Sequence, residues 1–282
     1  MMPTFELQCG GLTRTYLVYL PPAYTPWRAV PLLLAFHGGE SEAWSMDRLT
    51  NFNQVSATRN FIVVYPNGYQ KHWGDGRGTT PSERDGVDDV AFIELLLETL
   101  FRQFHIDHRR VYATGISNGG YFALRLGCEL AQKIVAVASV AASLPTNLAP
   151  LCQISPSVPM LLIHGTADKL VPAIGGELVQ GVGGNILPVA ATVSLWARRN
   201  ECPGPPKIEN LPISERDGTW VQRTTYPGHN LLPSVVFYKI VNGGHTWPGG
   251  WQYLPPLLIG KTSQNLDASS VIWDFFQIHA LL

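Results

Sequence analysis

A serine flanked by glycines follows an apolar run near the middle of the chain, and this feature restricts the possible folds most. Residues 111–116 (VYATGI) show the pattern of a buried β-strand, and Ser117 follows at once. A helical pattern begins after Gly119 and Gly120, at residues 121–124. This strand–turn–helix setting predicts a strained turn that projects the serine hydroxyl from the end of a strand. Gly115 and Gly119 have no side chains, and a side chain would clash where the turn is tightest.

Apolar strands alternate with helical segments along the chain. Residues 13–20 alternate and are rich in β-formers, and the later runs are continuously apolar, as in strands covered on both faces. The later strands are expected at residues 30–36, 61–65, 134–140, 159–163 and 235–241, and the helices at 88–104, 121–131, 188–199 and 271–278. This order predicts an α/β fold, with a mostly parallel central sheet flanked by helices. We expect one domain over residues 1–282, with no large lid domain.

The composition restricts the partners of the chain. Over 282 residues the formal net charge is −1 and charged residues make up 15%, too few for the basic surface that binds nucleic acid. No apolar run is long enough to span a bilayer. We therefore expect neither nucleic acid nor a membrane among the partners. The N-terminus lacks a basic segment followed by an apolar one. The chain as written is thus expected in the cytoplasm, or outside the cell if a signal was removed.

Four of the expected strands end in loops that carry chemically competent residues. These are His37-Gly38-Gly39, Ser117, Asp168 and His245. Ligands of such sheets collect at the carboxyl ends of the strands, so these loops are expected to meet. The order serine, aspartate, histidine is the order of the catalytic triad in α/β-hydrolases. The sequence therefore predicts Ser117, Asp168 and His245 as catalytic residues.

Each predicted residue has a chemical role in acyl transfer. A serine hydroxyl is a poor nucleophile and needs a base within hydrogen-bonding distance. His245 would take the proton of Ser117 and return it to the leaving group, and Asp168 would hold the imidazole tautomer and stabilise its cation. The backbone N–H groups of Gly39 and Asn118 are expected to form the oxyanion hole.

Other residues compete for the base and acid positions. The alternatives are His229, His279, Glu177 and Asp217. None of them directly follows a buried strand, whereas His245 and Asp168 do, so we favour these two. His37 and His164 resemble metal ligands at first sight, but bracing of their own strand-end loops is the favoured interpretation. The four cysteines show no Cys-x-x-Cys spacing, so no zinc site or other metal site is predicted. Their pattern leaves one or two disulfides open.

The chain resembles the α/β-hydrolase family that groups polyhydroxybutyrate depolymerases with feruloyl and acetyl-xylan esterases, which is carbohydrate esterase family 1-like. The matching stretches extend over almost the whole chain, and the string GGHTWPG at residues 243–249 is the most distinctive. The others are His37-Gly38-Gly39, residues 63–68, Trp73, residues 87–93, 111–120, 164–168 and 268–276.

The resemblance implies a serine esterase without a cofactor, with Ser117, Asp168 and His245 at the triad positions. It also implies a disulfide between Cys128 and Cys152, whereas Cys202 lacks the usual partner cysteine near residue 226. Trp73 and Trp247 lie in loops expected near the site and are predicted to bind substrate by stacking. Trp251 shares the loop of Trp247, and simple packing of that loop is the alternative for both.

We interpret the sequence as that of a serine carboxylesterase for short-chain or hydroxycinnamoyl (feruloyl-type) esters, acting through an acyl-enzyme. Its partner would be a small-molecule or oligosaccharide ester. The alternatives are a polyhydroxyalkanoate (3-hydroxybutyrate) depolymerase or oligomer hydrolase, an acetyl-xylan esterase, a serine peptidase and, outside enzymes, an inactive hydrolase-fold binding protein. No lysine or arginine is clearly placed to receive a carboxylate, which favours neutral esters.

Overall fold

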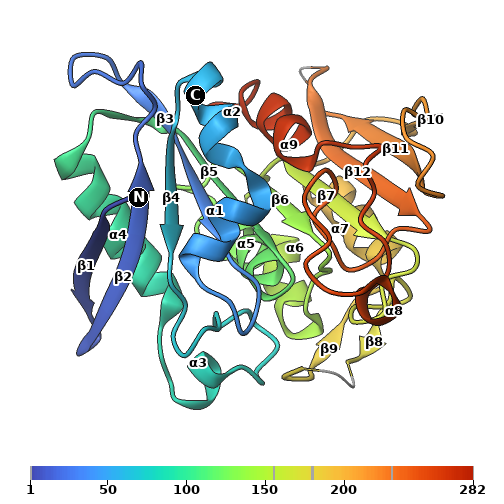
Figure 1. Ribbon diagram of the computed structural model, residues 1–282, viewed down its shortest axis with the longest axis horizontal. Coiled ribbons are helices and arrows are strands. Elements are labelled where there is room, and N and C mark those ends of the chain that lie inside the picture. Colours follow the sequence, from blue (N-terminus) through green and yellow to red (C-terminus); the bar gives the residue numbers. More distant parts are fainter. Residues whose placement is uncertain (1, 155, 179–180, 230, 282) are drawn as a thin grey trace.

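A ten-stranded sheet runs through the molecule in the order β1-β2-β4-β3-β5-β6-β7-β12-β11-β10 (Figure 1). The computed structural model describes residues 2–154, 156–178, 181–229 and 231–281. Its strands are β1 (Thr4–Cys9), β2 (Leu12–Tyr19), β3 (Val30–Phe36), β4 (Ile62–Pro66), β5 (Ile106–Ile116), β6 (Ala136–Val140), β7 (Met160–Gly165), β10 (Lys207–Asn210), β11 (Trp220–Pro227) and β12 (Pro233–Val241). The single domain expected over residues 1–282 includes residues 1, 155, 179–180, 230 and 282, which lie outside this description.

The central strands of the sheet are parallel and the edges are antiparallel. Strands β4, β3, β5, β6, β7 and β12 pair in parallel, as expected from their continuous apolar runs. The edges are formed by antiparallel pairs of β1 with β2, β2 with β4, β12 with β11, and β11 with β10. The sequence interpretation omitted β1, β10 and β11. Strands β1 and β10 are partly exposed and mixed in polarity, and so lack the apolar run that identifies a buried strand.

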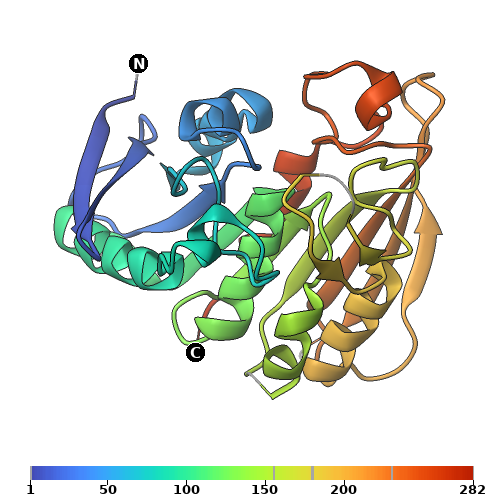
Figure 2. The same ribbon diagram turned by 90° about the horizontal axis from the view of Figure 1, so that it is seen from below.

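Helices cover both faces of the sheet (Figure 2). Helices α1 (Ala43–Thr50), α2 (Phe52–Arg59) and α9 (Ala268–Phe276) pack on one face, and α4 (Asp89–Gln103), α5 (Asn118–Glu129) and α7 (Val189–Arg199) pack on the other. Strand β3 shows how one buried strand serves two cores. Leu32, Leu34 and Phe36 point to one, and Leu33 and Ala35 to the other, as the period of two along a strand requires.

Besides the helices that cover the sheet, the connections that follow the parallel strands contain only short elements in the described part of the chain. These are α3 (Pro81–Arg84), the 3₁₀-helix η1 (Thr146–Leu148), α6 (Ala149–Ile154), the pair β8 (Gly176–Glu177) and β9 (Asn185–Ile186), and α8 (Pro256–Ile259). They agree with the expectation of no large lid domain. None of the described helices has the length and apolar character that a bilayer crossing needs.

A disulfide joins Cys128 in α5 to Cys152 in α6, with Cα atoms 4.9 Å apart. This confirms the pair implied by the family resemblance. Cys9 and Cys202 are free thiols, each partly buried. The disulfide closes a loop with a sequence separation of 24 residues. This loop runs from α5 through β6 to α6. The disulfide therefore restrains the unfolded chain around the elements that carry Ser117.

We expect the double variant C128A/C152A to unfold more easily than the wild type. Closure of a loop of this length stabilises a protein by roughly 3 kcal/mol. The measurement is the free energy of unfolding in urea without reductant. The variant C202A, which removes a partly buried free thiol, is the control and should lose clearly less. Equal losses in both variants would contradict a stabilising role of the disulfide.

Candidate active site

Ser117 occupies a strained backbone conformation between β5 and α5. Its φ is 55° and its ψ is −123°, a combination that non-glycine residues rarely adopt. Its N–H donates to Val140 O over 2.9 Å, which ties the turn to the end of β6. A Cβ atom on Gly119 would lie 2.3 Å from Phe36 O, and one on Gly115 would lie 2.4 Å from the carbonyl of Gly119. The two glycines are thus required by close backbone contacts, as the sequence predicted.

Asp168 and His245 form a buried pair beyond the ends of β7 and β12. His245 Nδ1 donates to Asp168 Oδ2 over 2.8 Å, and both residues are buried. The other carboxylate oxygen of Asp168 accepts the N–H groups of Leu170 (2.9 Å) and Val171 (2.8 Å). The Asp168 carboxylate is therefore oriented from two sides. It orients the imidazole of His245 through Nδ1, so that Nε2 takes no part in this hydrogen bond.

Hydrogen bonds of the His245 backbone hold the loop that carries this residue. His245 N donates to Ile259 O over 2.6 Å, and the Tyr253 hydroxyl donates to His245 O over 2.6 Å. The ring therefore belongs to a rigid loop, in which both polar backbone groups of the histidine have partners.

The glycine loop after β3 lies beside the serine turn. A Cβ atom on Gly38 would lie 3.6 Å from Ser117 Cβ, and one on Gly39 would lie 3.8 Å from Asn118 Cβ. Asn118 is the first residue of α5, where backbone N–H groups have no partner within the helix. The two residues predicted to form the oxyanion hole are therefore adjacent to each other and to Ser117.

His37 and His164 each brace the loop after their own strand. His37 donates from Nδ1 to Gly38 O (2.7 Å) and accepts the Gly68 N–H at Nε2 (2.9 Å). His164 Nε2 donates to Val171 O over 2.9 Å. This is the role favoured from the sequence. Within the described ranges, no group of three or more His, Cys, Asp or Glu side chains is arranged to hold a metal ion.

The prediction that Trp73 and Trp247 stack on a substrate is wrong, because both indoles are packed in the interior. Trp73 is fully buried, stacks on Phe122 with ring centroids 4.9 Å apart and donates from Nε1 to His37 O. Trp247 is 1% exposed and donates from Nε1 to Ser269 Oγ. Trp251 is 52% exposed and lines a pocket at Ser117. Sequence position places a tryptophan in a loop but does not show which face of the loop it occupies.

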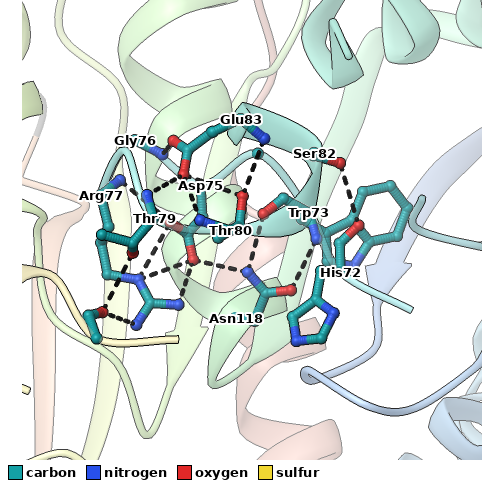
Figure 3. A network of polar contacts seen from close by, with 12 residues as sticks. His72, Trp73, Asp75, Gly76, Arg77, Thr79, Thr80, Ser82, Glu83 and Asn118 are labelled. Carbon is teal, nitrogen blue, oxygen red and sulfur yellow. Dashed lines mark hydrogen bonds and ion pairs between the residues drawn. The ribbon is translucent and has the colours of Figure 1, made fainter. Parts of the chain in front are cut away.

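A polar network that sequence reasoning missed connects the serine turn to residues 73–83 (Figure 3). The Asn118 side chain accepts the Trp73 N–H (2.8 Å) and donates to Trp73 O (3.0 Å) and Asp75 Oδ2 (2.6 Å). Arg77 forms a buried ion pair with Asp75 at 2.8 Å and donates to Gly183 O. The only sequence signal was the length and glycine content of this segment. The network holds the Asn118 side chain in place. The direction of the Asn118 backbone N–H is then set by the start of helix α5.

Two pockets meet at Ser117, and Gly39, Ser117 and Leu170 line both. The His245 pocket has a volume of about 260 Å³ and also includes Met46, Leu49, Ile116, Trp251, Tyr253 and Leu254. The Tyr121 pocket has a volume of about 360 Å³ and also includes His72, Arg77, Asn118, Tyr121, Val171 and Leu178. Arg77 is the cation that the sequence did not place near the site, but Asp75 already pairs with it.

The ten-stranded sheet, with a serine at the sharp turn between β5 and α5, defines an α/β-hydrolase. The chain belongs to the esterase family whose model, described as "Putative esterase", matches residues 11–229. The relative "Putative esterase NocK" from Nocardia uniformis subsp. tsuyamanensis is 30% identical over 96% of this chain and 81% of its own length.

Further relatives are named as feruloyl esterases. Feruloyl esterase B from Piromyces equi is 30% identical over 71% of this chain, which spans only 38% of that protein. Feruloyl esterase C from Emericella nidulans is 27% identical over 93% of this chain and 83% of its own length. Together with the family match, these relatives identify the protein as a carboxylic ester hydrolase.

Solved structures share the fold at low sequence identity. The ferulic acid esterase of Anaeromyces mucronatus, in complex with ferulic acid, aligns with a TM-score of 0.61 and 15% identity, over 99% of this chain and 90% of that one. The acetyl xylan esterase from Aspergillus awamori aligns with a TM-score of 0.63 and 14% identity, over 86% and 94%. At these identities the match establishes the α/β-hydrolase fold.

The buried His37 predicts a loss of stability in acid. Burial lowers the pKa of His37 from 6.5 to about 4. Because the unfolded chain binds this proton near pH 6.5 and the folded chain only near pH 4, stability present above pH 6.5 is lost as the pH falls through this range. The loss is roughly 3 kcal/mol for this one group.

The variant H37Q tests this dependence, because glutamine accepts the Gly68 N–H but does not titrate. Urea unfolding between about pH 7 and pH 4 should show a smaller loss of stability in H37Q than in the wild type. Parallel curves for the two proteins would contradict the assignment.

Proposed function

We propose that this esterase uses Ser117 as its nucleophile, His245 as general base and acid, and Asp168 to orient His245. The observation that carries the proposal is the His245 pocket, which is lined both by the strained Ser117 and by the imidazole that Asp168 holds at 2.8 Å. Such a constellation is recognised by its geometry and by the role of each group.

The first half of the reaction forms an acyl-enzyme. Ser117 Oγ attacks the ester carbonyl carbon while His245 Nε2 takes the hydroxyl proton. The carbonyl oxygen becomes an oxyanion, which the N–H groups of Gly39 and Asn118 stabilise. Collapse of the tetrahedral intermediate breaks the carbon–oxygen bond, and the departing alcohol receives the proton from His245.

The second half releases the acid. Water loses a proton to His245 Nε2 and attacks the acyl carbon, and Ser117 Oγ leaves with the proton that His245 returns. Asp168 stays ionised throughout and compensates the positive charge of the imidazolium. The two backbone N–H groups that orient Asp168 hold it in place for both halves.

We propose short-chain and hydroxycinnamoyl esters as substrates. Three features support neutral esters of this kind: the apolar side chains of the His245 pocket, the neutralised Arg77 and the relatives named feruloyl esterases. Acetylated sugars are a second candidate. A relative named as a bifunctional acetylxylan esterase/xylanase, from Neocallimastix patriciarum, is 28% identical over 57% of this chain, which spans 22% of that protein.

The variant S117A should lose hydrolysis of p-nitrophenyl acetate and methyl ferulate by at least roughly 10³-fold, because no other group supplies the attacking oxygen. Initial rates measure this loss, and covalent labelling by a fluorophosphonate probe should vanish in parallel. Ser41, which also lines the His245 pocket, gives the matched control S41A, which should still be labelled. Undiminished hydrolysis by S117A would disprove the assignment.

The variant D168N should lower kcat by roughly 10³–10⁴-fold, with a smaller effect on KM. Asparagine can accept the two backbone N–H groups, but its amide donates where the carboxylate accepted from His245 Nδ1. The imidazole then takes the tautomer that carries its proton on Nε2, which cannot act as a base. Steady-state kinetics measure the effect, and thermal unfolding checks that the fold is kept. A kcat within tenfold of the wild type would refute the orienting role.

A further inference from the structure

Tyr121 lines a pocket beside Ser117, and its hydroxyl is buried without a partner in the described part of the chain. It lies one helical turn after the serine in α5, where its N–H donates to Ser117 O over 2.9 Å. The side chain is 1% exposed, and none of the residues that the structure describes forms a hydrogen bond with its hydroxyl. Buried hydroxyls nearly always have a partner, so an unpaired one that lines a pocket needs an explanation. A partner brought by a ligand provides one.

The tyrosine ring is held rigidly, so its hydroxyl has a fixed position. The Arg77 guanidinium carbon lies 4.5 Å from the ring centroid. Arg77 is in turn fixed by its ion pair with Asp75 (Figure 3) and by its hydrogen bond to Gly183 O. Val171 and Leu178 belong to the same small apolar cluster as the ring. Burial raises the pKa of Tyr121, and the hydroxyl therefore keeps its proton and can donate a hydrogen bond. A preorganised donor of this kind discriminates between ligands with and without an acceptor.

We propose that the Tyr121 pocket is the acyl subsite of this esterase, and that the Tyr121 hydroxyl forms a hydrogen bond with a hydroxyl or ether oxygen on the acyl group. The inference rests on the proposed function, because it takes Ser117 as the nucleophile and His245 as the proton donor to the leaving group.

The position of His245 decides which pocket takes which half of the ester. The leaving oxygen must reach His245 to receive its proton, and His245 lines only one of the two pockets described. The alcohol therefore departs through the His245 pocket, beside the half-exposed Trp251. The acyl group extends to the other side, along Asn118 and Tyr121.

The chemistry of the Tyr121 pocket selects acyl groups that combine an apolar body with an oxygen substituent. Leu170, Val171 and Leu178 supply apolar contacts, and Tyr121 supplies a neutral donor. An unsubstituted acyl group of the same shape would leave the hydroxyl without a partner. One neutral hydrogen bond then corresponds to a preference of about tenfold.

The test compares matched ester pairs that differ by one oxygen. The pairs are methyl 4-hydroxycinnamate with methyl cinnamate, and ethyl 3-hydroxybutyrate with ethyl butyrate. In the wild type, kcat/KM should favour the oxygenated ester by about tenfold in at least one pair. In Y121F this ratio should fall to about one. A wild-type ratio near one in both pairs, or a ratio unchanged in Y121F, would overturn the proposal.

The variant Y253F is the matched control. It removes a tyrosine hydroxyl from the His245 pocket, where that group donates to His245 O. Its rates can fall, but they should fall equally for both members of a pair, so that the ratio of the wild type is kept. Collapse of the ratio in Y253F as well would show that Tyr121 has no specific role.

Binding provides a second measurement that does not depend on turnover. Calorimetry with S117A should show methyl 4-hydroxycinnamate binding about tenfold more tightly than methyl cinnamate, if the first pair is the one discriminated. Otherwise the butyrate pair should show the difference. Equal affinities within both pairs would refute the subsite. Continued hydrolysis by S117A would instead refute the proposed function, so the two failures are distinguishable.

Discussion

The close contact between the serine turn and the end of β3 is the constraint on which the rest of the site depends. The carbonyl oxygens of Phe36 and His37 lie 2.3 Å and 2.5 Å from the position that a Cβ on Gly119 would take. No side chain fits there, so α5 begins directly against the neighbouring strand. This contact places the glycine loop after β3 beside Ser117 and Asn118, which is what an oxyanion site between these loops requires.

Buried polar contacts hold the loops that complete the site. Asn118 binds the segment around Trp73 and Asp75 with its side chain, and Asp168 binds both its own loop and His245. Each of these groups is buried, and in a low-dielectric environment hydrogen bonds to fixed partners are strong and directional. The parallel strands bring the loops to one edge of the sheet, and these contacts then fix them.

The two pockets at Ser117 differ in the polar groups that face them. His245, whose imidazole would protonate a leaving alcohol, lines one pocket, and Tyr121, whose ring stacks on the neutralised Arg77, lines the other. In the proposed mechanism, this asymmetry would orient an ester across the serine. With the acyl group in the Tyr121 pocket, the leaving alcohol would lie in the His245 pocket, where the histidine can protonate it.

The amino-acid sequence by itself determined the central parallel strands, helices α4, α5, α7 and α9, the glycine-bounded serine turn and the order of Ser117, Asp168 and His245. These features depend on local chain stiffness and on periodic apolar patterns, which are legible along the chain. Helices α1 and α2 were not predicted. Of the antiparallel strands at the edges, β1, β10 and β11 were not predicted. Strands β1 and β10 gain their partners only in the sheet and carry no apolar run of their own.

Only the tertiary structure decided which loop residues face the site. Trp73 and Trp247 turn into the core, whereas Trp251, Tyr121 and Arg77 line the pockets. A loop residue chooses its side by packing against segments far away in the chain, as Trp73 does against Phe122 and Asn118. That choice depends on contacts between distant residues. Local sequence patterns do not encode it.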